Sequence, residues 1–93
     1  MTSRETYVLR LYVTGMTARS TRAISAVRSV CDEHLAGRYT LEIIDVYQQP
    51  ARIREDQIVA IPTLVKSGPS PLRRIIGDMS NRDRLLLGLG LPA

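Results

Sequence analysis

Apolar and β-branched residues gather in four short runs along this chain. The first run, residues 7–13, is interrupted only by Arg10 and predicts a strand. Because it is apolar on both faces, it is typical of a central strand that is covered on both sides. Residues 40–47 predict a second strand, and residues 61–66 and 72–78 predict a third and a fourth. The last two lie close enough in the sequence to form a hairpin.

Between these runs, apolar residues recur with helical spacing. Thr17 is the predicted N-cap of a helix over residues 18–35, and Gly37 follows it as a stop signal. Its apolar stripe consists of Ile24, Val27, Cys31 and Leu35. We therefore expect the Cys31 thiol to be a buried structural group. Pro50 opens a second helix, short and polar, in the segment ARIREDQ.

A third helix follows the last strand. Ser80 is its predicted N-cap, and Asp83 takes the place of the acidic residue of a capping box. Its buried face is expected from four leucines, Leu85, Leu86, Leu87 and Leu89. Gly88, Gly90 and Pro92 weaken this helix and then end it.

The elements follow the order βαβαββα in a single α/β domain that spans residues 1–93. The first strand–helix–strand unit implies a right-handed crossover and a parallel pair, so the four-stranded sheet is mixed and flanked by helices. This arrangement resembles that of thioredoxin. Pro62 matches the position where thioredoxin-like proteins carry a cis proline before a strand. The resemblance therefore implies a cis bond at Pro62, which costs an X–Pro peptide only about 0.5–1 kcal/mol.

The charge of the chain is formally +4, and Arg supplies twelve of its thirteen basic residues, Lys66 being the one Lys. Arg favours planar, bidentate contacts with carboxylates and phosphates. Two interpretations stay open, a solvated surface and an acidic or phosphate-bearing partner.

Met1 leads into charged residues, and no apolar run approaches the roughly 18 residues of a membrane span. We expect a cytoplasmic protein without a membrane partner.

The sequence argues against catalysis and predicts neither a cofactor nor a metal. A thioredoxin-type active site would lie in the segment TGMTARS, which has no Cys. Cys31 is the only Cys, which excludes a CxxC pair, and His34 is the only His. Thr17 and Ser20 lack a neighbouring base. A vestigial thioredoxin-like redox protein remains the alternative, and replacing Cys31 tests it.

Two groups of basic residues are candidates for partner binding. Arg19 and Arg22 lie three residues apart on one helical face, near a helix N-terminus that disfavours cations. Lys66, Arg73 and Arg74 gather near one end of the predicted hairpin, and only one of the two arginines can share a face with Lys66. The alternatives are solvent screening for the first group and edge-strand protection for the second.

An ordered set of segments resembles the KaiB family from about Tyr7 to Leu91. The set consists of YVLRLYVTGMT, RSTRA, LEIIDVYQQP, IPTLVK and RRIIGDMSNRDRLLLGL. The resemblance implies a protein that binds the ring-shaped ATPase KaiC and modulates its phosphorylation cycle, in circadian timing or in a related stress response. It also implies KaiA-like or SasA-like components as further partners, and a homo-oligomer, dimer or tetramer.

The resemblance also implies site residues. Basic positions of the family coincide with Arg19, Arg22, Lys66, Arg73 and Arg74, and we expect these to contact a KaiC-type ATPase. A nucleic-acid or polyanion binder is the alternative, but the chain has no contiguous basic run and no set of aromatic residues for stacking.

Cyanobacterial KaiB is metamorphic, with a ground state whose C-terminal half has a different order of helices and strands. This chain departs from the cyanobacterial pattern in that half. Gly90 stands where the pattern usually has Asp, and SGPSP replaces a proline run. As a separate matter of partner binding, Gln57 takes a position that often carries Lys, so one basic contact of the family is expected to be missing. The chain also stops at Ala93, without the usual acidic tail. We expect this member to live mainly in the thioredoxin-like state, with Pro62, Gly88 and Gly90 as its structural positions.

Overall fold

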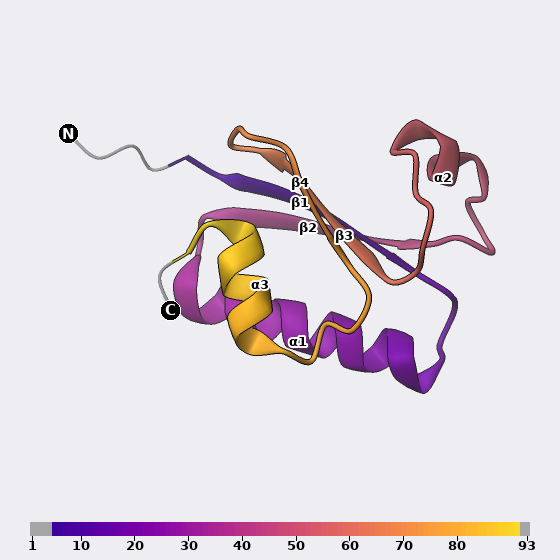
Figure 1. Cartoon of the computed structure of the whole chain (residues 1–93), viewed down its shortest axis with the longest axis horizontal. Helices are drawn as coiled ribbons and strands as arrows, with labels where there is room; N and C mark the ends of the chain where they lie inside the picture. The colour runs from indigo at the N-terminus through magenta and orange to yellow at the C-terminus, as the bar shows by residue number, and fades with distance from the viewer. Residues whose placement is uncertain (1–4, 92–93) are drawn as a thin grey trace.

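The chain forms one mixed sheet with helices on both faces, in the order predicted from its sequence (Figure 1). The computed structural model describes residues 5–91. Its strands are β1 (Tyr7–Val13), β2 (Tyr39–Asp45), β3 (Thr63–Gly68) and β4 (Arg73–Ile76). Its helices are α1 (Ala18–His34), α2 (Ala51–Glu55) and α3 (Arg82–Leu89).

The strand order β2-β1-β3-β4 places β1 inside the sheet, as its two apolar faces predicted. β1 is parallel to β2, with Tyr7 opposite Tyr39, and antiparallel to β3. β3 and β4 form the expected antiparallel hairpin. The edges of the sheet are therefore β2 and β4.

The two faces of the sheet hold separate clusters of buried side chains. On one face, alternate residues of β1 such as Leu9 and Leu11 pack with residues of α1 and α3. On the other face, Tyr12 packs with Ile44 and Val65 beneath α2. Figure 1 shows α1 and α3 on one side of the sheet and α2 on the other. This division decides which strand residues can reach which helix.

α1 begins and ends as its sequence predicts. The Thr17 hydroxyl accepts a hydrogen bond from the Ser20 backbone N–H at 3.1 Å, which confirms it as the N-cap. Cys31 is fully buried among core residues, and this burial, with a smaller effect of Asp32, raises the pKa of the thiol to about 11.

The predicted cap of α3 is wrong by one residue. Asn81, and not Ser80, accepts from the Arg84 backbone N–H at 3.1 Å. The Ser80 N–H instead donates to Asp78 Oδ1 at 2.8 Å, which keeps Ser80 in the turn before the helix. Three residues after the true cap the chain has Arg84, so the capping box expected with Asp83 does not form.

The buried face of α3 also differs from the prediction at one position. Leu85, Leu86 and Leu89 are buried, but Leu87 is 82% exposed. With about 3.6 residues per turn, three consecutive leucines do not fit on one buried face. The helix ends at Gly90, whose φ of +74° is left-handed. Pro92, expected to terminate the helix, lies outside the described residues.

Prolines and glycines of the C-terminal half adopt specific backbone geometries. The Ile61–Pro62 bond is cis, as the thioredoxin resemblance implied, and so are Gly68–Pro69 and Ser70–Pro71. Gly88 faces Ile75 so closely that an added Cβ would lie 2.5 Å from its Cγ1. Gly88 therefore lets α3 approach β4.

Candidate partner-binding surface

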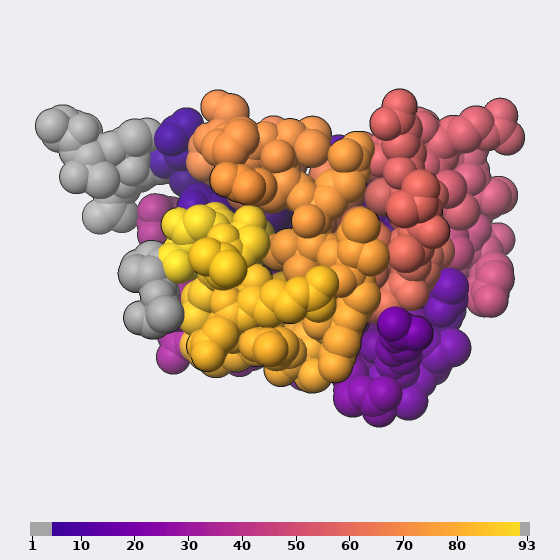
Figure 2. Space-filling view, in the orientation of Figure 1, coloured from indigo at the N-terminus to yellow at the C-terminus, as the bar shows by residue number. Residues whose placement is uncertain are grey.

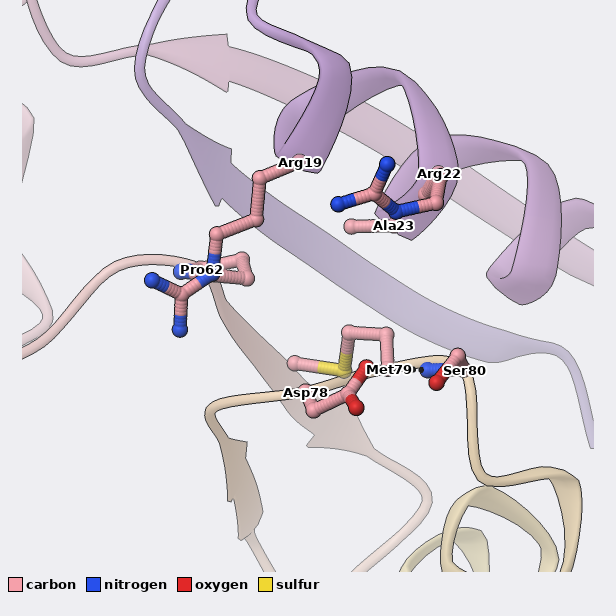
Figure 3. A pocket seen from close by; sticks show the side chains of 7 residues that line it. All are labelled: Arg19, Arg22, Ala23, Pro62, Asp78, Met79 and Ser80. Carbon is pink, nitrogen blue, oxygen red and sulfur yellow. Dashed lines mark hydrogen bonds between the residues drawn. The ribbon is translucent and has the colours of Figure 1, made fainter.

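Arg19 and Arg22 project from the first turns of α1 over a pocket of about 320 Å³ (Figure 3). The wall opposite α1 comes from Pro62 and from the connection between β4 and α3. The remaining lining residues are Ala23, Asp78, Met79 and Ser80. The pocket therefore combines segments that are far apart in the sequence.

The local structure explains how the pocket is held. The buried Ser20 hydroxyl lies 3.1 Å from the backbone N–H of Thr14, which donates to it, and so fixes the start of α1 against the end of β1. The Gly77 N–H donates to the Pro62 carbonyl at 3.0 Å and joins the other two segments. The Arg84 guanidinium donates to the carbonyl oxygens of Asp78 and Ile76. These bonds fix the backbone beneath the two arginines.

The pocket is rich in positive charge. Within residues 5–91, neither Arg19 nor Arg22 forms a side-chain hydrogen bond or an ion pair. Hydrogen bonds from Ser80 lower the pKa of Asp78, and the fields of the two arginines lower it further. Asp78 is thus held as a carboxylate, and two guanidinium groups remain available to an anionic group of a partner.

The second predicted group divides between the two faces of the sheet. Lys66 pairs with Arg73, and Val65 pairs with Arg74. Arg73 therefore shares a face with Lys66, and Arg74 points to the other face, as alternation predicted. There the Arg74 guanidinium donates to the Asp56 carbonyl at 2.9 Å.

Lys66 presents little surface to a partner. It is only 5% exposed, and its Nζ lies 5.5 Å from the centre of the Tyr7 ring, within cation–π range. Arg73, opposite Lys66 in the hairpin, is exposed. Of the three residues in this group, the two arginines thus offer the accessible charge.

The structure does not bring the two groups together. The hairpin places Ile76 opposite Thr63, next to Pro62, and Arg73 three residues further along β4. At about 3.3 Å per residue, this separates the Arg73 backbone from the pocket end of β4 by about 10 Å. Arg84 lies between them and was not predicted from the sequence, because only the packing of α3 on β4 brings it there.

A polar network beneath α2 was also missed. Arg10 makes two hydrogen bonds to Asp56, at 2.6 and 2.7 Å, and the Tyr12 hydroxyl donates to the same carboxylate at 2.5 Å. Arg52 pairs with Glu42 at 2.9 and 3.0 Å. The sequence signal was Arg10 itself, the polar residue that interrupts an apolar strand.

The protonation states of this network suit a structural role. The hydrogen bond with Arg10 is the main cause that lowers the pKa of Asp56. Burial, followed by the hydrogen bond to Asp56, raises the pKa of Tyr12 to about 12. Both shifts favour the ordinary protonation states at neutral pH, whereas proton transfer is most effective with a pKa near the working pH. The network fastens α2 to the sheet.

Three features of enzymes and membrane proteins are absent from residues 5–91: a cysteine at the start of α1, a metal-binding group and a membrane-spanning helix. The connection from β1 to α1 and the first turn of α1, residues 14–20, contain no Cys. Across the described part of the chain, no three His, Cys, Asp or Glu residues form a group suited to a metal ion. No helix in that part has the length and apolar character needed to cross a membrane.

Comparison with known proteins gives a consistent result. The KaiB domain model matches residues 10–91. A circadian clock oscillator protein KaiB from Synechococcus sp. (strain RCC307) is 50% identical over 91 residues, covering 98% of this chain and 83% of the relative. The circadian clock protein KaiB3 from Synechocystis sp. (strain ATCC 27184 / PCC 6803 / Kazusa) is 52% identical over 84 residues, covering 90% and 82%.

Solved structures agree on the fold. The N-terminal domain of Synechococcus elongatus SasA superposes with a TM-score of 0.75 and 23% identity, covering 97% of this chain and 89% of that domain. Mitochondrial thioredoxin 3 from Saccharomyces cerevisiae has a TM-score of 0.72 and 17% identity, covering 92% and 78%. These likenesses confirm the thioredoxin-like fold.

Proposed function

Because the chain belongs to the KaiB family, we propose that it is a non-catalytic interaction module that binds a KaiC-type ring ATPase. In this role it modulates the phosphorylation cycle of the ATPase, in circadian timing or a related stress response. The observation that carries the proposal is the 50% identity to a clock oscillator protein over 98% of this chain. We extend the proposal to a further partner of KaiA-like or SasA-like type, on the ground of the family alone.

The exposed arginines are the proposed contacts. Arg19 and Arg22 offer two guanidinium groups without a protein partner in the described residues, and Arg73 and Arg74 flank the free edge of β4. Such groups bind carboxylates with two parallel hydrogen bonds. Lys66 lies opposite Arg73 in the hairpin but is buried, so Arg73 carries the accessible charge of this pair.

The proposal includes the state in which the protein works. The thioredoxin-like arrangement exposes all four arginines, and we assign binding to this state. We place the protein in the cytoplasm, as a homo-oligomer that is a dimer or a tetramer. Gly90 favours this state because its left-handed φ of +74° ends α3 without a side-chain penalty.

Capture of a KaiC homologue from the same genome, with ATP present, tests the proposal. The wild-type protein should retain the ATPase, and Arg19→Glu/Arg22→Glu and Arg73→Glu/Arg74→Glu should each weaken capture about tenfold or more. Arg28→Glu/Arg54→Glu is the matched control, because both arginines are exposed and outside these groups. If the folded protein captures no such ATPase, the specific function proposed here is wrong.

A polyanion binder is the second candidate, favoured by the net charge of +4 and the twelve arginines. A mobility shift with DNA or RNA that weakens steeply with salt, together with failed ATPase capture, would support it instead.

A further inference from the structure

A groove of about 490 Å³ runs along the free edge of the sheet, between β4 and α3. Figure 2 views this face, with β4 in orange and α3 in yellow side by side. The groove is lined by Arg73, Arg74, Ile75, Ile76, Arg84, Leu87 and Gly88. It is separate from the pocket beneath Arg19 and Arg22.

The hydrogen bonding of the hairpin shows which peptide groups face this groove. The Gly77 N–H donates to the Pro62 carbonyl at 3.0 Å, one step beyond the Ile76–Thr63 pair. Hydrogen-bonded and non-hydrogen-bonded pairs alternate along an antiparallel ladder. The peptide groups of Ile75 therefore face β3, and those of Ile76 face outward.

The same alternation turns the peptide groups of Arg74 outward. Within residues 5–91, no backbone group pairs with this outer edge of β4. The group that does reach it is the Arg84 guanidinium, which donates to the Ile76 carbonyl oxygen. The edge thus presents a short row of strand hydrogen-bonding groups, with the N–H and C=O of Arg74 at its centre.

The side chains around this row combine apolar surface with positive charge. Leu72, Ile76 and Leu87 are 51%, 39% and 82% exposed, respectively. Three cations, those of Arg73, Arg74 and Arg84, line the groove without a carboxylate among its lining residues. An occupant must therefore supply backbone groups, apolar side chains and negative charge together.

We propose that this edge binds an extended acidic segment of a partner protein, which adds to β4 as a fifth strand. Strand addition satisfies the outward peptide groups. Side chains of the segment alternate between the two faces, and each face offers an arginine and apolar surface, Arg74 with Ile76 on one and Arg73 with Leu87 on the other. Nucleic acid offers negative charge but no backbone pattern that matches a strand edge. A second copy of this chain is disfavoured, because a two-fold edge pair would place the Arg74 residues of both copies near one another.

This inference rests on the proposed function, because Arg73 and Arg74 are proposed both as contacts of the ATPase and as part of the strand-binding edge. The experiment therefore uses a peptide and no ATPase. The probe is a heptapeptide of alternating valine and glutamate, blocked at both ends and titrated at millimolar concentration into ¹⁵N-labelled protein. Saturable shifts should centre on the Arg74 and Ile76 amides, and their hydrogen exchange should slow.

Two control peptides separate strand addition from simple charge attraction. A peptide with lysine in place of glutamate should not bind, and one with N-methyl groups on alternate peptide nitrogens should bind at least about tenfold more weakly. In the protein, Arg74→Glu should weaken the glutamate peptide about tenfold or more, and Arg74→Gln less. Arg28→Glu should leave the affinity within about twofold, since Arg28 is exposed on α1.

Several results would overturn the inference. Equal binding of the N-methylated peptide would show that no strand forms, and shifts centred on β2 would place the strand at the opposite edge. Preferential binding of a DNA or RNA oligonucleotide to the same amides would assign the groove to nucleic acid. ATPase capture by wild-type protein that fails to bind the peptide would refute strand addition and leave the proposed function intact.

Discussion

Gly88→Ala tests how closely α3 packs on β4. A Cβ at this position would lie 2.5 Å from Ile75 Cγ1 and 2.6 Å from its Cδ1. Carbon atoms in contact ordinarily lie about 3.5–4.0 Å apart, so either the Ile75 side chain or the helix must move by about 1 Å. Ile75 is 6% exposed and part of the core beneath α3, which leaves it little room to do so.

The expected net effect is a loss of stability. Alanine is favoured over glycine inside a helix by about 1 kcal/mol. Inserting a methyl group into a well-packed core costs about 1–3 kcal/mol, and a contact this short belongs in the upper part of that range. The free energy of unfolding should therefore fall by about 1–2 kcal/mol, which lowers the Tm by roughly 5–15 °C for a domain of this size.

Urea unfolding followed by circular dichroism measures this change. The m-value should equal that of the wild type if the substitution leaves the surface area exposed on unfolding unchanged. Ile75→Ala removes both atoms that the new Cβ would meet. Without the clash only the helix-propensity gain of Ala over Gly remains, so the double variant should lose about 2–3 kcal/mol less than the sum of the single variants. Leu87→Ala, on the exposed side of α3, is the control and should change stability by about 0.5 kcal/mol at most. Wild-type or higher stability of Gly88→Ala would refute this packing of α3.

Three further predictions concern separate parts of the chain. Gly90→Ala should lose about 1 kcal/mol of unfolding free energy in the same assay, because its φ is +74°; an unchanged value would contradict the left-handed cap. Asp56 has a lowered pKa, so its stabilisation is present above the unfolded pKa of about 3.9 and is lost as the pH falls through the folded value. Arg10→Met should cost about 2 kcal/mol at neutral pH and flatten this acid dependence, whereas an acid profile equal to wild type would refute the role of Arg10. Cys31, buried with a pKa of about 11, should react with a thiol reagent at pH 8 only on unfolding, and Cys31→Ala should leave any disulfide-reductase background unchanged.

The elements of the fold could be predicted from the sequence because burial repeats along each of them. β1 is apolar on both faces because it lies between β2 and β3 with helices on both sides. The helical stripe that includes Cys31 is buried for the same reason. The rule failed at Leu87, where an apolar residue faces solvent, since helical geometry overrides composition in a run of three leucines.

The candidate site was harder to predict, because it depends on strand register and packing. Alternation correctly predicted that only one of Arg73 and Arg74 shares a face with Lys66, and the hairpin register shows that it is Arg73. That Lys66 is buried against Tyr7 follows only from the register of β3 on β1, which shifts between Val8 and Leu9. A basic residue can be assigned to a face from alternation, but its exposure depends on what its neighbouring strand carries.

Arg84 is a residue of the candidate site that no local sequence pattern predicts. In the sequence it is one of several arginines near the third helix, with nothing to distinguish it from Arg82. In the structure it crosses from α3 to two carbonyl oxygens, that of Ile76 at the end of β4 and that of Asp78 in the β4–α3 connection. The first carbonyl belongs to the free edge of β4, and the second to the residue whose carboxylate faces Arg19 and Arg22. The Arg84 side chain therefore connects the groove with the pocket. An added strand that donates a hydrogen bond to the Ile76 carbonyl would compete with Arg84 for this oxygen, and so would affect the order of the groove and of the pocket together.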